Sequence, residues 1–379
     1  MRVNNLAKVL FMTHSPIPDN RIDRETLTLI SEGHEVYIIY PSSKGNVPSH
    51  FKQSYQIPIS KRVFSLLPFA SQKYAKKVKL VINEVHPDII HAHDIVAANI
   101  ARLIKTKEKF VYDDHEIWEI YLRNRMKEAK GGFNKLKKWL FYFREKQVFP
   151  KVRDKIDLLI VINHFWEDYY RKRKVTSDII TLENFPSKKL IDNVLSDKIS
   201  VEEFFTKDQR KKVIHTTNMK ISSDVVRNVI SIAEAVNELP DWMLVVFGPE
   251  DENYIGKSVK FFQKRPLEEF LACCAKCTIG ANLMPIYNDW YNYISSNRIF
   301  ELTTLGLNLF STKVKTLMDK FGENFIWVDE KIEKEEVIKI LEKIDNYPLG
   351  SKMREIAKNF FWEKQEKKLV SSYEKLLTK

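Results

Sequence analysis

The sequence is poor in several features that would assign it to a large class of proteins. Its 379 residues include three cysteines and ten glycines, and no apolar run approaches the roughly 18 residues of a membrane-spanning helix. The apolar run near the N-terminus is interrupted by Lys8 and is followed by no small-residue cleavage site, so we expect no signal peptide. So few cysteines do not build a disulfide framework, and they fit a reducing compartment. We therefore expect a soluble cytoplasmic protein.

The three cysteines lie together in the stretch LACCAKC, as Cys273, Cys274 and Cys277. The spacing Cys274-x-x-Cys277 also occurs in metal and redox motifs. A structural zinc needs four ligands, however, and no second cluster of cysteine or histidine offers a partner pair. We interpret the three as small buried residues where a helix meets a strand, and we expect no metal site.

Composition and patterning indicate a globular α/β protein. Apolar residues make up 44% of the chain and charged residues 30%, and a length of 379 residues suggests two domains at roughly 150 residues each. Short β-branched runs alternate with helical patterns, which is the signature of βαβ units and parallel sheets. Strands are expected at 9–14, 35–40, 87–93, 109–114, 157–163, 179–184, 213–218, 243–248, 259–262, 278–284, 307–312 and 325–329.

The segment 187–212 is polar and contains no buried strand, so we place the domain boundary there. The predicted domains are residues 1–190 and 200–350, and the helical stretch 351–379 is long enough to return to the first domain. The predicted fold has two Rossmann-like, doubly wound domains that face a central cleft. Such a cleft, beyond the carboxyl ends of the strands, is the default ligand site.

The net charge of +12 is concentrated in one region. Residues 123–155 hold twelve basic and three acidic side chains, a local excess of +9. Within this region Leu136, Trp139, Leu140 and Phe143 recur at helical spacing. One interpretation is an ordinary helix with a solvated basic face, and another is contact with an anionic membrane surface. No nucleic-acid motif accompanies the charge, so no nucleic-acid partner is expected.

Two charged clusters follow predicted strands, where ligands bind in open α/β sheets. One is His91, His93 and Asp94, and the other is the run 113–116, which reads DDHE. His115 could donate a hydrogen bond or transfer a proton near neutral pH. Alternatively, the carboxylates cap the next helix and the histidine is structural. Both interpretations stay open at this point.

A third candidate is the stretch 295–312, SSNRIFELTTLGLNLFST. Either of its first two serines can cap a helix that ends before Gly306. The N-terminus of such a helix favours anions, and Arg298 in its first turn adds positive charge. Glu301 lies one turn further and could accept both hydroxyls of a ribose. An ordinary ion pair between Arg298 and Glu301 on a surface helix is the alternative.

Several of these stretches together resemble group 1 glycosyltransferases, family 4, of the GT-B fold. The resemblance is carried by DIIHAHD (88–94), VYDDHE (111–116), LENFP (182–186) and NRIFELTTLGLNLFST (297–312). The segment 20–36 is similar to the family's first helix, which has an arginine near its start and ends in G-H-x-V. Order and spacing match over nearly the whole chain.

The resemblance implies transfer of a sugar from a nucleotide-diphosphate donor to an acceptor hydroxyl, with anomeric retention, without a metal ion and with no cofactor besides the donor. The aromatic and basic side chains of segment 123–155 suggest in addition an acceptor held at a membrane, such as a lipid-linked sugar or a growing surface polysaccharide. Carried onto this chain, the catalytic residues are His115 and Asp94. The donor-binding residues are Glu301, Arg298, Asn297, Ser296, Lys220, Asn218, Gly248 and Tyr293. The acceptor-side residues are Arg21, His93 and Glu116.

Three departures from the family pattern motivate an alternative function. Tyr293 stands where the family has a glutamate eight residues before Glu301. The usual Gly-Arg and Lys-Gly pair is missing, and Asn218 and Lys220 occupy its region. The Gly-rich loop after the first strand reads HSPIPDN. A non-catalytic GT-B subunit that binds a partner transferase or a membrane is therefore the alternative function, and a nucleotide-sugar epimerase is a more distant one.

Overall fold

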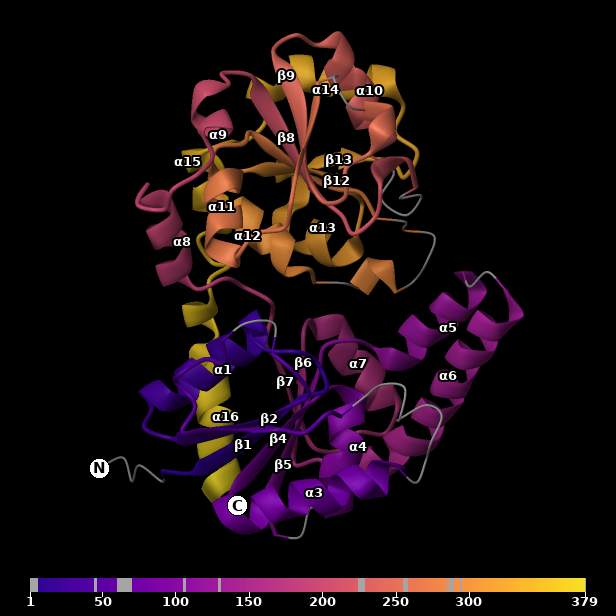
Figure 1. Ribbon diagram of the computed structural model, residues 1–379, viewed down its shortest axis with the longest axis vertical. Helices are drawn as coiled ribbons and strands as arrows, with labels where there is room; N and C mark the ends of the chain where they lie inside the picture. The colour runs from indigo at the N-terminus through magenta and orange to yellow at the C-terminus, as the bar shows by residue number, and fades with distance from the viewer. Residues whose placement is uncertain are drawn as a thin grey trace. The chain divides into compact units, whose positions relative to one another are not determined.

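A computed structural model describes residues 6–43, 46–59, 70–104, 107–128, 131–223, 229–254, 258–284, 286, 290–293 and 295–378. The chain divides into two compact units. The N-terminal unit comprises the chain up to Glu183 together with the segment that begins at Gln365, and the C-terminal unit comprises Asn184–Lys364. Each unit is an α/β layer structure with its own parallel sheet (Figure 1).

The N-terminal unit contains seven of the described strands. The strands are β1 (Lys8–Met12), β2 (Glu35–Tyr40), β3 (Gln53–Gln56), β4 (Ile89–His93), β5 (Lys109–Asp114), β6 (Leu158–Val161) and β7 (Asp178–Thr181). The helices are α1 (Asn20–Ser31), α3 (Ala70–Val85), α4 (Asp94–Ile104), α5 (Trp118–Glu128), α6 (Gly132–Arg153), α7 (His164–Lys172) and α16 (Glu366–Thr378). Apart from β3, every strand begins within two residues of its predicted start, and only β7 ends more than two residues from its predicted end, three residues early at Thr181. The edge strand β3 was missed because its sequence, QSYQ, is polar and mostly exposed.

The sheet of this unit has the order β3-β2-β1-β4-β5-β6-β7, and all of its pairs are parallel. The strand order reverses between β1 and β4, which is the switch point where ligands bind in such sheets. Helix α16 packs beside α1, and α4 contacts both α3 and α6 (Figure 1). The register of β4 and β5 pairs His93 with Asp113, so the two charged clusters found in the sequence end side by side.

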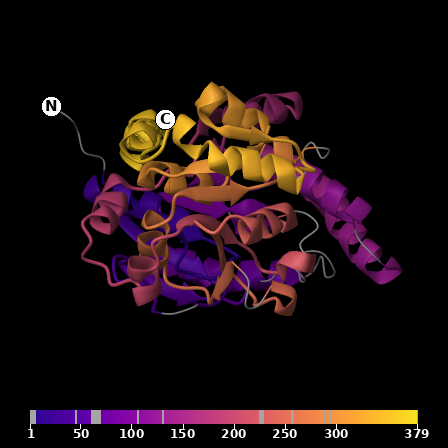
Figure 2. The same ribbon diagram turned by 90° about the horizontal axis from the view of Figure 1, so that it is seen from above.

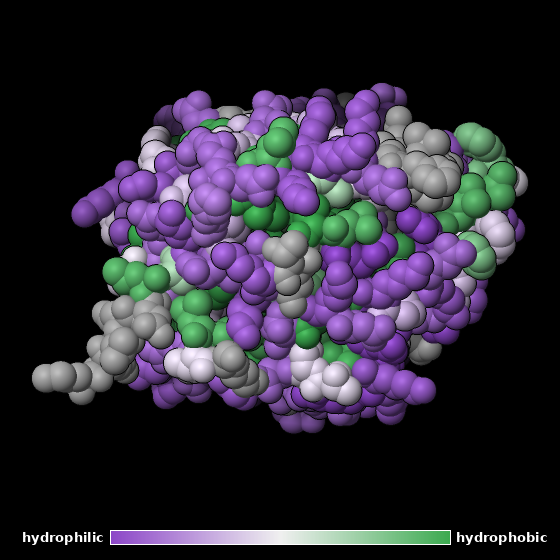
Figure 3. Space-filling view, turned by 90° about the horizontal axis from the view of Figure 1, so that it is seen from below, coloured by the Kyte–Doolittle hydropathy of each residue, from purple (hydrophilic) through white to green (hydrophobic). Residues whose placement is uncertain are grey.

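Helices α5 and α6 form a hairpin that extends outward from the N-terminal unit (Figures 1 and 2). The second half of α6 is anchored, because Val148, Phe149 and Val152 are buried. The first half is mostly exposed. Hydrophobic side chains gather at the edge of the molecule where this hairpin lies (Figure 3).

The C-terminal unit holds the second sheet, in the order β10-β9-β8-β11-β12-β13. Its strands are β8 (Lys211–Thr216), β9 (Trp242–Phe247), β10 (Val259–Phe262), β11 (Ile279–Asn282), β12 (Asn308–Thr312) and β13 (Ile326–Val328). Its α-helices are α8 (Lys188–Leu195), α9 (Glu203–Lys207), α10 (Ile230–Glu238), α11 (Leu267–Ala275), α12 (Asn297–Leu305), α13 (Lys315–Phe321), α14 (Lys334–Glu342) and α15 (Ser351–Ala357). Single 3-10 turns are η1 (Ile221–Ser223), η2 (Glu252–Tyr254), η3 (Tyr291–Tyr293), η4 (Gly322–Asn324), η5 (Ile344–Asn346) and η6 (Trp362–Lys364).

Two hydrophobic cores cover the two faces of this sheet. Helices α10 and α14 pack over one face, and α8, α11, α12 and α15 contact one another over the other. Cys273 and Cys274 are buried in the second of these cores, near the point where α11 leads to β11. This agrees with their interpretation as core residues. Burial raises the pKa of the Cys273 thiol to about 11, which keeps it protonated and unreactive.

The observed boundaries differ from the predicted ones at two places. The segment 187–212 was expected as a polar linker, but its helices α8 and α9 place Ile191, Val194 and Phe205 in the core of the C-terminal unit. The final stretch was expected as one helix from residue 351. It is broken instead, because α15 packs against α12 and only α16 belongs to the N-terminal unit. None of the helices in the described ranges is long and apolar enough to span a bilayer.

Candidate functional site in each unit

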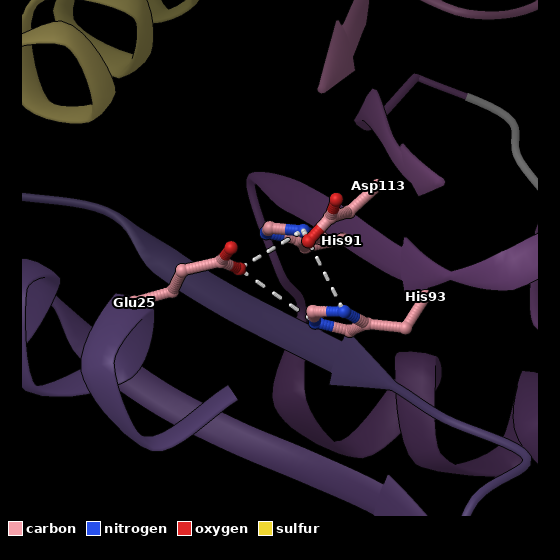
Figure 4. A group of neighbouring side chains, drawn as sticks. All are labelled: Glu25, His91, His93 and Asp113. Atoms are coloured by element: carbon pink, nitrogen blue, oxygen red, sulfur yellow. Dashed lines mark ion pairs between the residues drawn. The ribbon is translucent and has the colours of Figure 1, made fainter. Parts of the chain in front are cut away.

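In the N-terminal unit, the pleat of β4 and β5 gathers the charged residues on one face of the sheet. Residues two apart on a strand point to the same face, so His91 and His93 lie together, with their rings stacked at 4.6 Å between centroids. Asp113 is paired in register with His93 and points the same way. Figure 4 shows Glu25 of α1 approaching the same group from outside the sheet.

Arg21 joins this group from the first turn of α1. The carboxylate of Asp19 caps this helix by accepting from the backbone N–H groups of Arg21 and Ile22. The Arg21 guanidinium donates to both oxygens of Asp113, at 2.7 and 2.9 Å, and to the carbonyl of Leu182 at 2.8 Å. Burial alone would raise the pKa of Asp113, but the charges of Arg21 and His115 outweigh it and hold that pKa well below the usual range.

His115 follows β5 and is the most exposed of these residues, with 24% of its side chain accessible. Its Nε2 lies 2.9 Å from Nδ1 of His93 and 3.3 Å from Oδ2 of Asp113. Burial would lower the pKa of His115, but the charges of Asp113 and Asp94 raise it to about 10. The imidazole is therefore protonated at neutral pH, and it offers an N–H donor.

Asp94 begins α4 directly after β4, with a positive φ of 63°. Its Oδ1 accepts from the backbone N–H of His115 at 3.3 Å and from the indole of Trp118 at 3.0 Å. Asp94 thus holds the loop that carries His115, so part of its role is structural. Glu116, the predicted acceptor-side residue that follows His115 in this loop, is half-buried.

Asp114 points to the opposite face of the sheet from Asp113. It accepts from the hydroxyl of Tyr112 at 2.8 Å and from that of Tyr170. Burial and the nearby charge of Asp94 raise the pKa of Asp114 well above its usual value. Of the four ionisable residues in the DDHE run, Asp114 therefore serves the structural role that the sequence left open.

Glu25, His91, His93 and Asp113 could supply metal ligands, since one atom from each lies within 4.8 Å of the others (Figure 4). Both histidines are neutral, because burial lowers the pKa of His93 and brings that of His91 to about 3. Neutral imidazoles and carboxylates are the ligands of zinc. The expectation of no metal site is not tested by this geometry and stays a prediction.

The guanidinium of Arg21 argues for a polar core here rather than a metal centre. It holds both oxygens of Asp113 and lies 3.1 Å from Oε1 of Glu25, so a divalent cation would sit against a fixed positive charge. Burial and the charge of Asp113 raise the pKa of Glu25 well above its usual range. A proton on Glu25 therefore reduces the buried negative charge without a metal.

In the C-terminal unit, helix α12 begins and ends where the sequence predicts, although the side chain of its N-cap serine makes no capping hydrogen bond. Ser296 is its N-cap residue, and Gly306 ends it in the left-handed conformation with a φ of 103°. Asn297 is its first residue. The Arg298 guanidinium donates to Oε2 of Glu301 at 2.9 Å. The ion pair considered from the spacing is therefore present, although Glu301 is buried rather than on the surface.

A pocket of about 360 Å³ opens beside this helix. Its described lining consists of Thr216, Thr217, Asn218, Phe247, Lys264, Arg265, Leu267, Phe270 and Arg298. These residues follow or end β8, β9 and β10, or belong to α11 and α12. The Arg298 guanidinium lies over the Phe270 ring at 3.9 Å. Three basic side chains at the carboxyl edge of a sheet suit a ligand with negative charge.

The pocket includes only some of the predicted donor residues. Arg298 and Asn218 line it, and Gly248 lies beside it, where a Cβ would meet the carbonyl oxygen of Thr217 at 2.8 Å. Lys220 is not among the described lining residues, because its side chain is exposed and pairs with Glu252 at 3.2 Å. Tyr293 in η3 is not among them either.

Sequence reasoning missed residues in both units. Lys264 and Arg265 supply basic groups to the pocket, and the signal for them was the QKRP stretch directly after a strand. In the sequence, both residues lie outside the region of Asn218 and Lys220, where the family has its usual basic pair. Glu25 and Asp113 were missed as partners of Arg21, since their contacts join residues far apart in the sequence.

Comparisons with known proteins agree with this picture. Residues 21–185 match the family described as Glycosyltransferase Family 4. No curated protein matches the chain significantly by sequence. Sucrose-phosphate synthase from Thermosynechococcus elongatus is similar in structure, with a TM-score of 0.70, 14% identity and coverage of 98% of this chain and 99% of that one.

Two further solved structures show the same fold. HepE from Anabaena, solved in complex with UDP, has a TM-score of 0.67 and 12% identity, with coverage of 97% and 100%. A Listeria monocytogenes protein assigned as a UDP-N-acetylglucosamine 2-epimerase has a TM-score of 0.61 and 13% identity, with coverage of 95% and 94%. The resemblance to family 4 and the GT-B fold class of two Rossmann-like units are therefore confirmed. Because transferases and an epimerase share this fold, the fold alone does not select the reaction.

Proposed function

We propose that this chain, whose N-terminal unit matches glycosyltransferase family 4, transfers a sugar from a nucleotide-diphosphate donor to an acceptor hydroxyl with retention at the anomeric carbon. The observation that carries the proposal is the basic pocket of the C-terminal unit, lined by Lys264, Arg265 and Arg298. A diphosphate has the charge and size to occupy it. The family match of the N-terminal unit supports the transfer reaction rather than the epimerase alternative.

In this proposal the pocket stabilises the leaving group. The bond between the anomeric carbon and the phosphate oxygen breaks, and negative charge develops on the diphosphate. Arg298 lies in the first turn of α12, where its charge and the free backbone N–H groups act together on an anion. Fixed positive charges of this kind let the reaction proceed without a metal ion at the diphosphate and without a cofactor besides the donor.

Glu301 would have two roles at this pocket. Its carboxylate holds the guanidinium of Arg298 in place at 2.9 Å, which favours a fixed orientation for phosphate contact. The resemblance also assigns Glu301 to the ribose hydroxyls, and an arginine-bound carboxylate keeps lone pairs free for such hydroxyls. We therefore propose both roles for the one side chain.

The N-terminal unit would supply the acceptor side, through Arg21, His93, Asp94 and Glu116. His115 would donate a hydrogen bond to an oxygen of the transferred sugar or its leaving phosphate. This role is supported by geometry, because His93 and Asp113 both contact Nε2 of the His115 imidazole and part of the side chain stays accessible. We further propose an acceptor in surface polysaccharide or glycolipid synthesis, used by a protein that associates peripherally with the membrane.

The first test is a thermal-shift screen of the purified protein against UDP, GDP, ADP, CMP and their common sugar conjugates. Binding to the folded state raises the melting temperature by linkage. We expect one nucleotide diphosphate to give a shift that is lost in Arg298→Ala. Lys339→Ala is the matched control, because it removes an exposed basic residue of α14 in the same unit that is not among the described lining residues, and it should keep the shift.

The reaction itself is tested by release of nucleoside diphosphate in the presence of candidate acceptors. Turnover that needs an acceptor and disappears in Glu301→Ala supports the transferase. Nucleotide binding without turnover, together with co-purification of an active transferase, would favour the non-catalytic subunit, for which Tyr293 in place of the family's glutamate is the motive. Conversion of the donor sugar in the absence of any acceptor would identify an epimerase.

A further inference from the structure

Helix α6 carries large hydrophobic side chains where a globular protein normally places polar ones. Phe133 is 69% exposed, Leu136 51%, Trp139 49% and Phe143 48%. We call these four residues the aromatic stripe. They lie within eleven consecutive residues, so they form one continuous patch rather than scattered exceptions.

The stripe occupies one face of the helix and turns away from its own unit. Steps of three, three and four residues keep its members on a single side of an α-helix, and the rings of Trp139 and Phe143 stack at 5.5 Å. Phe141, on another side of α6, contacts Trp118 of α5 at 5.3 Å between ring centroids. Because α5 packs against that side, the stripe is left facing outward.

Lysines border the stripe along its length. Lys137 places its ammonium 4.2 Å from the centroid of the Phe133 ring, and Lys135 lies toward the other edge of the helix face at an exposed position. Lys146 lies further along the helix and pairs with Glu119 of α5 at 3.2 Å. The surrounding segment 123–155 has an excess of nine positive charges in the sequence. Apolar residues in the centre with basic residues at the rim are typical of helices that lie in a membrane interface.

We propose that the aromatic stripe docks the N-terminal unit onto an anionic lipid bilayer, with the axis of α6 parallel to the membrane plane. The stripe would enter the boundary between headgroups and acyl chains. Lys135 and Lys137 would reach lipid phosphates while their aliphatic stems cover apolar surface. This inference deepens the proposed function by assigning the acceptor to the membrane, and it rests on that function only for this assignment.

The shape and the charge of the stripe and its rim favour a bilayer over nucleic acid. The stripe is a row of bulky side chains on one helix face of a projecting hairpin, which suits insertion between lipids. A duplex or single strand of nucleic acid would use the lysines but would leave an aliphatic residue such as Leu136 without a partner. The positive rim also matches the sign of charge of anionic headgroups.

The test is sedimentation of the full-length protein with vesicles of phosphatidylcholine alone or of phosphatidylcholine and phosphatidylglycerol in equal amounts. We expect binding to the anionic vesicles that weakens with added salt. The double variant Trp139→Ala with Phe143→Ala should weaken that binding about tenfold or more. The matched control is Leu80→Ala with Leu103→Ala, since these two exposed leucines of the same unit lie on α3 and α4, and it should bind as the wild type does.

A second pair of variants tests the charge separately. Lys135→Gln with Lys137→Gln should weaken binding to anionic vesicles about thirtyfold, which corresponds to about 1 kcal/mol for each lysine. Lys76→Gln with Lys79→Gln removes the same charge from exposed positions of α3 and should change binding far less. All of these positions are exposed, so circular dichroism should show every variant folded.

The proposal is overturned if the folded protein binds neither kind of vesicle, or if the stripe variants bind as tightly as their controls. A dimer in analytical ultracentrifugation that dissociates when Trp139 and Phe143 are replaced, without any vesicle binding, would assign the stripe to a second copy of the chain instead. Nucleotide binding by the C-terminal unit is measured without lipid. Vesicle binding, whether present or absent, therefore does not affect the test of the proposed donor site.

Discussion

Arg21 and Asp113, which are 92 residues apart in the sequence, form a buried pair with two parallel hydrogen bonds of 2.7 and 2.9 Å. The pair joins the first turn of α1 to the end of β5. It also fixes Asp113, which contacts His115 and His93. One guanidinium thus determines the geometry of the charged group at the carboxyl edge of the sheet.

The Arg21–Asp113 pair is expected to be essential for the stability of the N-terminal unit. Arg21→Gln leaves the Asp113 carboxylate buried with its main partner gone, which costs about 3 to 5 kcal/mol of unfolding free energy. Urea denaturation measures this loss. Lys375→Gln is the control, because its pair with Asp178 is well exposed and should contribute at most about 1 kcal/mol. Equal losses in the two variants would contradict the assignment.

The pKa of His115 predicts how stability depends on pH. This pKa is raised to about 10 in the folded protein, above its unfolded value of about 6.5. The stabilisation from the protonated form is therefore complete below pH 6.5 and is lost as the pH rises toward 10. Through this window we expect the unfolding free energy to fall by about 1.4 kcal/mol per pH unit more in the wild type than in His115→Asn.

NMR titration checks the same assignment directly. The His115 ring should keep the chemical shifts of an imidazolium from pH 5 to about 8, and Asp113→Asn should bring its titration back toward neutral pH. A His115 that titrates near 6.5 in the wild type would show that Asp113 and Asp94 do not hold its proton.

Tyr373 connects α16, the last helix, to the cluster of charged residues around Asp113. Its hydroxyl lies 2.6 Å from Nδ1 of His91, and both residues are fully buried. Tyr373→Phe should lower the unfolding free energy by about 1 to 2 kcal/mol, because it leaves a buried imidazole nitrogen without its partner. Tyr55→Phe removes an exposed hydrogen bond to Glu84 and should have a smaller effect in the same denaturation experiment.

Gly306 is expected to tolerate no side chain at the end of α12. Its φ of 103° is unfavourable for other residues, and a Cβ there would meet the Gly350 carbonyl oxygen and Nη1 of Arg354 at 2.8 Å. Gly306→Ala should therefore destabilise the C-terminal unit by about 1 to 3 kcal/mol. Gly132→Ala at an open position in α6 should be neutral or slightly stabilising. A neutral Gly306→Ala would show that the cap is not strained.

The sequence predicted most of the strands, because runs such as EVYIIY and MLVVFG are apolar on both faces and are bounded by helical patterns. It also predicted the two ends of α12, because the residues that mark them, Ser296 before the helix and Gly306 after it, act locally. It did not reveal β3, whose residues are polar. Nor did it reveal that α8 and α9 belong to the C-terminal unit, because their few apolar residues are recognisable as core only once they pack.

The candidate sites also combine features that the sequence determined with features that only the tertiary structure decided. The spacing of HAH by itself determined that His91 and His93 share one face of their strand, because side chains alternate along a strand. The register of β4 and β5, which only folding sets, placed Asp113 beside His93. Only the tertiary structure decided which of them carry charge. The pKa values depend on Arg21, Glu25 and burial, which reach the group from other elements. Likewise, only folding brought Lys264 and Arg265 to the pocket and left Lys220 outside it, because electrostatic contacts follow distance in space rather than separation along the chain.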